Sequence, residues 1–169
     1  SRTLVDVPLV KDENGYYTMD LESFEAMVQK KDVKLFILCS PHNPVGRVWT
    51  ADEIRRTAQI AHQAGVLFVC DEIHGEFVFG GSRYLPAAQV EGVDPLRTVI
   101  LTSPTKTFNL AGAGIAAIIA ADPKVRAKID RAINDNECCD VNVFGVAADI
   151  AAWNQGEEWL EALLSYLQG

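Results

Sequence analysis

Three short apolar runs recur along this chain and constrain its fold more than any other feature. They span Leu35–Cys39, Val66–Cys70 and Thr98–Thr102, and each has the composition of a β-strand buried on both faces. Segments with a helical spacing of apolar residues lie before the first run and between the first and the second. This alternation predicts right-handed βαβ units, and therefore a three-layer α/β/α fold with a mainly parallel sheet.

Capping residues indicate where the helices begin and end. Asp20 can cap one helix, Thr50 with Glu53 forms the T-x-x-E capping box of a second, and Gly65 ends that second helix. The remaining patterns predict strands over Leu4–Val10 and Ile115–Ala120, and helices over 123–133, Val143–Trp153 and Glu157–Leu167.

The last of these helices carries an apolar stripe of Leu160, Leu163, Leu164 and Leu167, which needs a partner to cover it. No repeat or linker interrupts residues 1–169. We therefore expect one domain that is incomplete on its C-terminal side.

Composition and charge exclude several classes of protein. The 169 residues are 49% hydrophobic and 22% charged, which is typical of one globular domain. The net charge of −8 has no compensating basic block, so we expect no nucleic-acid partner. The longest near-continuous apolar run, 111–121, is about half of the ~20 residues that a membrane helix needs, and no secretory signal is recognisable, so we expect neither a membrane partner nor export.

The four cysteines, Cys39, Cys70, Cys138 and Cys139, fit neither a zinc-binding spacing nor a CxxC motif. We interpret them as buried thiols of a reducing cytoplasm and expect no metal site.

Polar side chains follow each of the three apolar runs, where an open α/β sheet binds its ligands. An amide follows the first run, a carboxylate with an imidazole the second, and a lysine among hydroxyls the third: Asn43, Asp71 with His74, and Lys106 with Ser103 and Thr105. Together these groups can hold an anionic aromatic cofactor.

Each of these residues also has an ordinary structural explanation. Asn43 between two prolines is typical of a turn, Asp71 can cap the segment after its strand, and Lys106 alone would be a surface lysine. His74 and Glu72 would by default be solvated or paired polar residues, and Ser103 and Thr105 loop hydroxyls. Their joint placement at three consecutive strand ends favours a site.

Three motifs carry a family resemblance that covers essentially the whole chain. The segments 39–49 (CSPHNPVGRVW), 71–74 (DEIH) and 103–112 (SPTKTFNLAG) resemble the fold-type I pyridoxal-phosphate enzymes of the class I/II aminotransferase superfamily. Within it the chain is most similar to the cystathionine β-lyase subgroup of the MalY and PatB type. The resemblance implies the large, cofactor-binding domain of such an enzyme, in part.

The resemblance also implies roles for the site residues. Lys106 corresponds to the catalytic lysine that forms a Schiff base with pyridoxal 5'-phosphate, and Asp71 to the partner of the pyridine nitrogen. Asn43 and His74 would face the cofactor's phenolic oxygen, and Ser103 and Thr105 its phosphate, Ser103 being the stronger candidate. Where many aminotransferases place a cation eight residues after the lysine, this chain has Gly114.

The implied activity is a β-elimination that splits cystathionine or another cysteine S-conjugate into a keto acid, ammonia and a thiol. The alternatives are an aminotransferase and a catalytically inactive scaffold. We further expect an amino-acid substrate and a homodimer. The upstream phosphate-binding segment and the C-terminal small domain would lie outside residues 1–169, so we expect this chain alone to be inactive.

Overall fold

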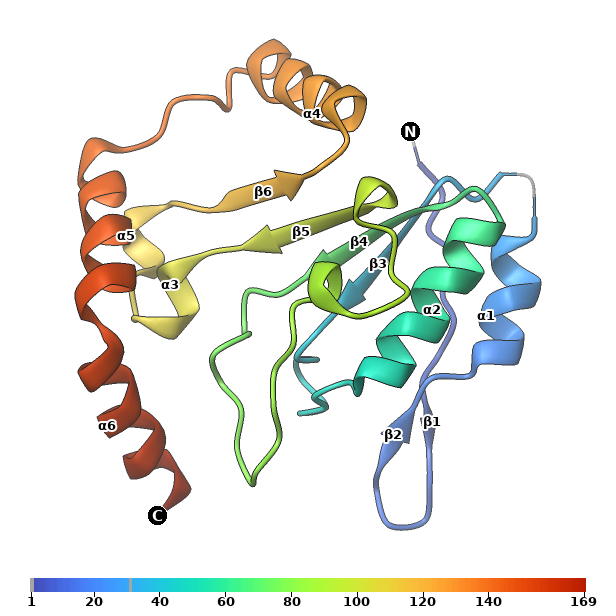
Figure 1. The fold of residues 1–169 in the computed structure, drawn as a ribbon, viewed down its shortest axis with the longest axis horizontal. Helices are drawn as coiled ribbons and strands as arrows, with labels where there is room; N and C mark the ends of the chain where they lie inside the picture. The colour runs from blue at the N-terminus through green and yellow to red at the C-terminus, as the bar shows by residue number, and fades with distance from the viewer. Residues whose placement is uncertain (1, 31) are drawn as a thin grey trace.

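The computed structural model describes residues 2–30 and 32–169, and its centre is a four-stranded sheet (Figure 1). The strands are β3 (Leu35–Cys39), β4 (Leu67–Asp71), β5 (Thr98–Thr102) and β6 (Ala117–Ala120), and they lie in the order β3-β4-β5-β6. The first three are parallel, whereas β6 runs antiparallel to β5. The predicted α/β fold with a mainly parallel sheet is confirmed.

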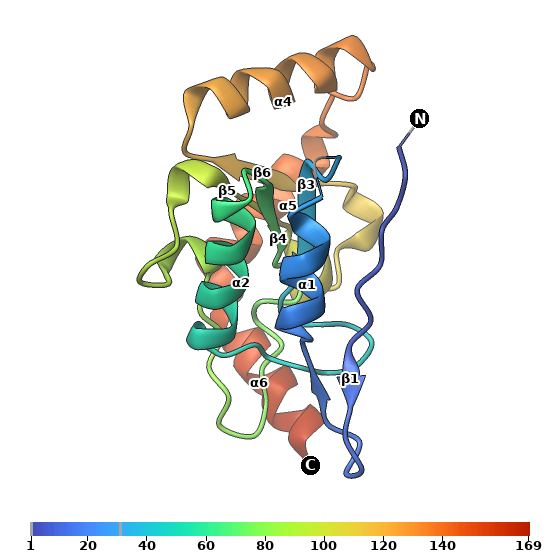
Figure 2. The same ribbon diagram turned by 90° about the vertical axis from the view of Figure 1, so that its right-hand side faces the viewer.

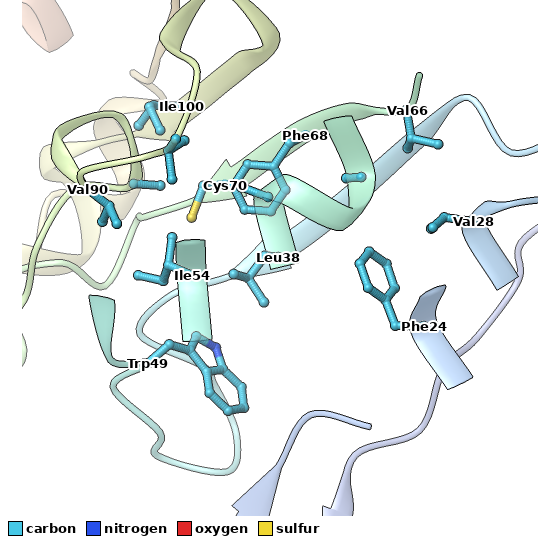
Figure 3. Packing of buried hydrophobic residues seen from close by; sticks show 14 residues of the cluster. Phe24, Val28, Leu38, Trp49, Ile54, Val66, Phe68, Cys70, Val90 and Ile100 are labelled. Carbon is cyan, nitrogen blue, oxygen red and sulfur yellow. The ribbon is translucent and has the colours of Figure 1, made fainter. Parts of the chain in front are cut away.

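One face of the sheet carries most of the hydrophobic core. Helices α1 (Leu21–Val28) and α2 (Ala51–Gln63) cover this face, and both predicted caps are present, with Thr50 and Glu53 in a complete capping box. Alternate residues of the strands point toward these helices, so Leu38, Phe68 and Ile100 become buried (Figure 3).

The opposite face is covered more thinly. Helix α4 (Pro123–Asp135) packs Val125 and Ile129 against a small cluster of Val69, Val99 and Ala120. Figure 2 shows α4 crossing one end of the sheet, away from α1 and α2. At the β3 edge of this face Leu35 and Ile37 remain exposed. Helices therefore lie on both faces, but the buried cluster beneath α1 and α2 is much larger than the one beneath α4.

The predicted strand over Leu4–Val10 is wrong. Only Val10 and Lys11 form a strand, β1 (Val10–Lys11), which pairs with β2 (Tyr17–Thr18). The carboxylate of Asp12 accepts hydrogen bonds from the backbone of Asn14 and Tyr16, which closes the turn of this hairpin. Val7 and Leu9 instead pack against the core, which explains their apolar character without strand pairing.

Three longer helices make up most of the chain after β6. After the short helices η1 (Ala87–Gln89), η2 (Pro95–Arg97), α3 (Pro104–Thr107) and η3 (Ala111–Ala113), α4 leads to α5 (Val143–Gln155) and α6 (Glu157–Gln168), as Figure 1 shows. In the apolar stripe Leu160, Leu163 and Leu164 are half-buried and Leu167 is exposed. Among the described residues no helix is long and apolar enough to cross a membrane.

The expectation of four buried thiols holds only in part. Cys70 is buried and Cys39 half-buried, because both lie in strands of the sheet. Cys138 and Cys139 are exposed, since they lie in the connection between α4 and α5, which no element covers. All four are free thiols.

Candidate active site

The carboxyl ends of β3, β4 and β5 lie level with one another. Cys39 pairs in register with Asp71, and Asp71 pairs with Leu101. Neighbouring strands lie about 4.8 Å apart, so the loops that leave these ends start side by side. Asp71 is the last residue of the middle strand and is half-buried, and its carboxylate accepts a 3.2 Å hydrogen bond from the backbone N–H of Ile73.

Asn43 and His74 come together from two different loops. The Asn43 Nδ2 atom lies 3.5 Å from His74 Nε2, although 31 positions separate the two residues in the sequence. They line a hollow of about 250 Å3 together with residues of both loops: Pro41, His42, Pro44, Gly46 and Phe77. The predicted juxtaposition of the amide and the imidazole is thus present in the fold.

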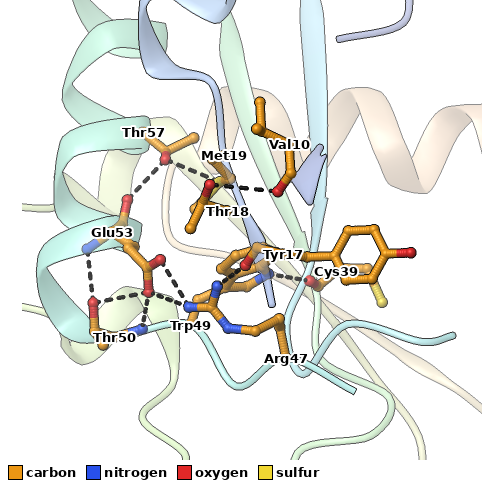
Figure 4. A network of polar contacts seen from close by, with 10 residues as sticks. All are labelled: Val10, Tyr17, Thr18, Met19, Cys39, Arg47, Trp49, Thr50, Glu53 and Thr57. Atoms are coloured by element: carbon orange, nitrogen blue, oxygen red, sulfur yellow. Dashed lines mark hydrogen bonds and ion pairs between the residues drawn. The ribbon is translucent and has the colours of Figure 1, made fainter. Parts of the chain in front are cut away.

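A buried arginine fixes the loop that carries Asn43. The backbone N–H of His42 donates to the carbonyl of Arg47 at 2.7 Å, which closes the turn around Asn43. Arg47 is buried, forms a 2.8 Å ion pair with Glu53 at the start of α2, and donates to the carbonyl of Tyr17 (Figure 4).

The same guanidinium lies between the rings of Tyr16 and Trp49, at 4.2 and 4.4 Å from their centroids. Burial acts to raise the pKa of Glu53, but hydrogen bonds from Thr50 and Arg47 outweigh it and hold this pKa below its usual value. Sequence reasoning identified Glu53 as part of a cap and missed Arg47, because the partners of an arginine are not visible in a linear pattern.

Lys106 lies in α3, directly beyond β5. The side chain of Ser103 caps this helix by accepting from the backbone N–H of Thr105 at 3.1 Å, and its hydroxyl donates to the carbonyl of Ile115 at 2.6 Å. The hydroxyls of Ser103 and Thr105 lie 2.7 Å apart. Ser103 is buried, Thr105 half-buried and Lys106 exposed, so Thr105 and Lys106 are the more accessible groups.

An aromatic cluster ties the Lys106 segment to the C-terminal helices. Phe108 lies edge-on to Trp153 at a centroid distance of 5.2 Å, and Trp159 lies 6.1 Å away. Gly156, between α5 and α6, faces the Phe108 ring so closely that a Cβ there would be 2.4 Å from a ring carbon. Sequence reasoning missed this cluster, for which the only sequence signal is the spacing of two tryptophans around a glycine.

Glu72 is the second residue whose surroundings the sequence did not reveal. It was expected to be solvated or paired, and it is buried beside the half-buried Asp71. Its carboxylate accepts from the backbone N–H of Ala87 at 2.7 Å and from the hydroxyl of Tyr84. Burial raises the pKa of Glu72, although these hydrogen bonds act in the opposite direction.

The fold therefore collects most of the expected groups at one edge of the sheet. It forms two contacting pairs, Asn43 with His74 and Ser103 with Thr105, from the loops around the central carboxylate of Asp71. Gly114 ends η3 with a φ of 59°, a left-handed conformation that favours glycine, and it contributes no cation to this edge.

Comparisons with known proteins place this arrangement in a family. The family model described as aminotransferase class I and II matches residues 2–168. The chain is 35% identical to cystathionine beta-lyase PatB of Bacillus subtilis over 167 residues, and 35% identical to protein MalY of Escherichia coli over 168 residues; each match covers 99% of this chain. A solved PLP-bound C-S lyase from Staphylococcus hominis superimposes with a TM-score of 0.88 at 31% identity, over 97% of this chain and 40% of that one.

The chain spans 43% of the length of PatB and 42% of that of MalY. Within that span the similarity is continuous, because both the sequence matches and the superposition extend over nearly every residue of this chain. The chain belongs to the class I and II aminotransferase family.

Proposed function

We propose that these strand ends bind pyridoxal 5'-phosphate and that the protein is a carbon–sulfur β-lyase. The observation that carries the proposal is the placement of Asp71 and of the Lys106 helix at the ends of two adjacent parallel strands. A carboxylate and an amine at neighbouring strand ends match the two groups of the cofactor that need them, its pyridine nitrogen and its aldehyde.

The other residues present also fit this cofactor. Asn43 and His74 supply an amide and an imidazole in contact, which suit the phenolic oxygen of the ring. The hydroxyls of Ser103 and Thr105 suit a phosphate oxygen, with the half-buried Thr105 more open to it than Ser103. Each polar group of the cofactor thus has a complementary side chain at this edge.

When bound, the cofactor supplies an electron sink for the pair released at the substrate's Cα. The chain's own residues hold the cofactor and move the proton. Lys106 would hold the cofactor covalently at rest, and once the substrate's amine has taken its place, the free amine of Lys106 would take the proton from Cα. Asp71 keeps the pyridine nitrogen protonated, because a carboxylate beside a nitrogen base favours the charged form of that base. Elimination releases the thiol, and one water molecule hydrolyses the remaining three-carbon fragment to a keto acid and ammonia.

Two features favour a lyase over an aminotransferase. His74 stands where the resemblance places a tyrosine in most aminotransferases, and Gly114 stands where many of them have a cation. The similarity to PatB and to the C-S lyase of Staphylococcus hominis supports the same choice. The aminotransferase remains the second candidate, since the same lysine can return the proton to the cofactor instead.

The rest of the proposal concerns the whole protein. Residues 1–169 would be part of the large domain of an enzyme with an amino-acid substrate. The chain covers 43% of PatB and 42% of MalY, which supports this proposal. A homodimer is supported by the exposed apolar side chains of α5, among them Val143, Phe144 and Ile150. Four free thiols support a reducing cytoplasm.

The test is made on the protein with its native flanking sequence. Given cystathionine, it should release pyruvate, ammonia and homocysteine without any added keto acid. Strict dependence on an acceptor such as 2-oxoglutarate would identify an aminotransferase. The Asp71→Asn variant should still bind the cofactor and lose several orders of magnitude in turnover, because an amide cannot hold the pyridinium proton. Near-normal turnover of this variant would mean that Asp71 is only a structural cap.

A further inference from the structure

Glu72 is the first residue of the turn that carries His74, and its carboxylate is buried. Glu72 is only 3% exposed, and its two oxygens receive the backbone N–H of Ala87 and the hydroxyl of Tyr84. Ala87 begins η1, which packs against α2 and β5, so this end of the contact is anchored in the core. One carboxylate thus closes the base of the whole loop between β4 and η1.

Tyr84 reaches back across this loop and packs on Gly75. A Cβ at Gly75 would lie 2.8 Å from one carbon of the Tyr84 ring and 2.9 Å from another. The hydroxyl of the same ring is held by Glu72. The ring is therefore fixed at its hydroxyl by Glu72 and at two of its carbons by the close approach of Gly75.

The turn between Glu72 and Gly75 determines where His74 lies. Gly75 N–H donates to the carbonyl of Glu72 at 2.9 Å, and Phe77 N–H donates to the carbonyl of His74 at 2.9 Å. On the other side the carboxylate of Asp71 accepts from Ile73 N–H. His74 thus lies in a turn that Asp71 holds from one side and the Tyr84 ring from the other.

We propose that Glu72 and Tyr84 are positioning residues that hold the turn in the shape that places the His74 imidazole against Asn43. They act through the turn and need not touch any ligand. The significance of His74 for a cofactor rests on the proposed function, whereas the placement of the ring can be tested without a cofactor.

Nuclear magnetic resonance of the chain gives the test, because it contains only three histidines. The wild type should show a cross-peak between the side-chain amide of Asn43 and the ring of His74, whose nitrogen atoms lie 3.5 Å apart. Tyr84→Phe removes only the hydroxyl, and Gly75→Ala places a methyl group too close to the same ring. Both variants should lose this cross-peak. The contact of the His62 ring with Phe68 should persist and show that the core is folded.

Two further variants separate positioning from a general loss of structure. Glu72→Gln should keep the cross-peak, because an amide can accept from Ala87 N–H and donate to the Tyr84 oxygen. Tyr166→Phe, at a tyrosine that is 82% exposed, should also keep it. A cross-peak that survives in both Tyr84→Phe and Gly75→Ala would overturn the proposal, and so would its loss in Tyr166→Phe.

A cofactor-trapping measurement on the same variants tells the two proposals apart. If pyridoxal phosphate fails to attach to Lys106 in the wild-type protein with its native flanking sequence while the cross-peak pattern is as expected, the proposed function fails and the positioning role stands. If the cofactor attaches to Lys106 and the cross-peak is insensitive to Tyr84 and Gly75, the positioning role is contradicted.

Discussion

The two ends of this chain differ in how they are held together. From α1 to β5 nearly every element contributes side chains to one buried cluster that includes Phe24, Leu38, Ile54 and Phe68. Helices α4 and α6 contain no buried residue, and α5 contains only Gly145. Large apolar side chains of α5 and α6 remain exposed instead, with Phe144 at 80% and Trp159 at 46%. Burial of apolar surface is the main stabilising term in folding, so stability is concentrated in the first region.

The proposed site includes residues from both regions. Asn43, Asp71 and His74 belong to the well-packed region, whereas the Lys106 helix is connected through Phe108 to the thinly packed C-terminal helices. The placement of the lysine therefore depends on the weaker half of the molecule. Tryptophans report on each half separately: Trp49 is buried in the core, and Trp153 and Trp159 lie in α5 and α6.

The largest expected effect comes from removing a core ring. Phe68 is fully buried, so Phe68→Ala should lower the free energy of unfolding by about 3–5 kcal/mol. The matched substitution Tyr166→Ala, at a ring in α6 that is 82% exposed, should change it by less than about 0.5 kcal/mol. Urea denaturation, followed by fluorescence in single-tryptophan variants that retain Trp49, measures the free energy of unfolding of both. Equal losses for the two variants would show that the C-terminal helices are packed as well as the core.

A glycine pair tests the link between the two regions. Gly156→Ala places a methyl group 2.4 Å from the Phe108 ring and should destabilise the C-terminal helices by about 1–3 kcal/mol. Gly112→Ala meets no atom within 4 Å, so it should stabilise by about 0.4–1 kcal/mol through the unfolded chain. The free energy of unfolding is measured by Trp153 fluorescence in single-tryptophan variants that retain Trp153. If Gly156→Ala is as harmless as Gly112→Ala, Phe108 does not join the lysine segment to α5 and α6.

A smaller effect is expected from acid. Burial lowers the pKa of His62, whose Nε2 lies 3.2 Å from the carbonyl of Arg97. The neutral form is therefore favoured in the folded state, and this contribution to stability is present above the ordinary pKa of about 6.5 and is lost as the pH falls through the lowered value. Between pH 7.5 and pH 5, the free energy of unfolding, followed by Trp49 fluorescence, should fall more in the wild type than in His62→Gln.

The transition reported by Trp153 should show no such difference, because all three histidines precede residue 75. An identical pH dependence of wild type and His62→Gln at Trp49 would contradict the assignment of this effect to His62.

Features that depend on local signals could be predicted from the sequence. The strands β3, β4 and β5 and the capping box of α2 follow from local signals, namely short apolar runs and a Thr–Glu pair three residues apart. The grouping of the expected site residues at one edge followed from a general rule about parallel sheets, and the contact of Asn43 with His74 agrees with it.

Features that depend on distant partners could not be predicted. Val7 and Leu9 are apolar because they cover the core, and apolar composition alone does not distinguish this from strand pairing. The burial of Glu72 depends on Tyr84, twelve residues away, and the antiparallel direction of β6 depends on the path of the chain through η3. The exposure of Cys138 and Cys139 reflects the absence of a covering element, which no local pattern encodes.

The most direct test of the proposed site is to find where pyridoxal phosphate attaches. The protein with its native flanking sequence is mixed with pyridoxal phosphate, reduced with borohydride, digested and mapped by mass spectrometry, with Lys106→Arg as the matched control. The label should be found on Lys106 in preference to the other lysines, and it should be absent from that peptide in Lys106→Arg. A label on Lys11, Lys34 or Lys124 with Lys106 unmodified would contradict the assignment of the cofactor to these strand ends.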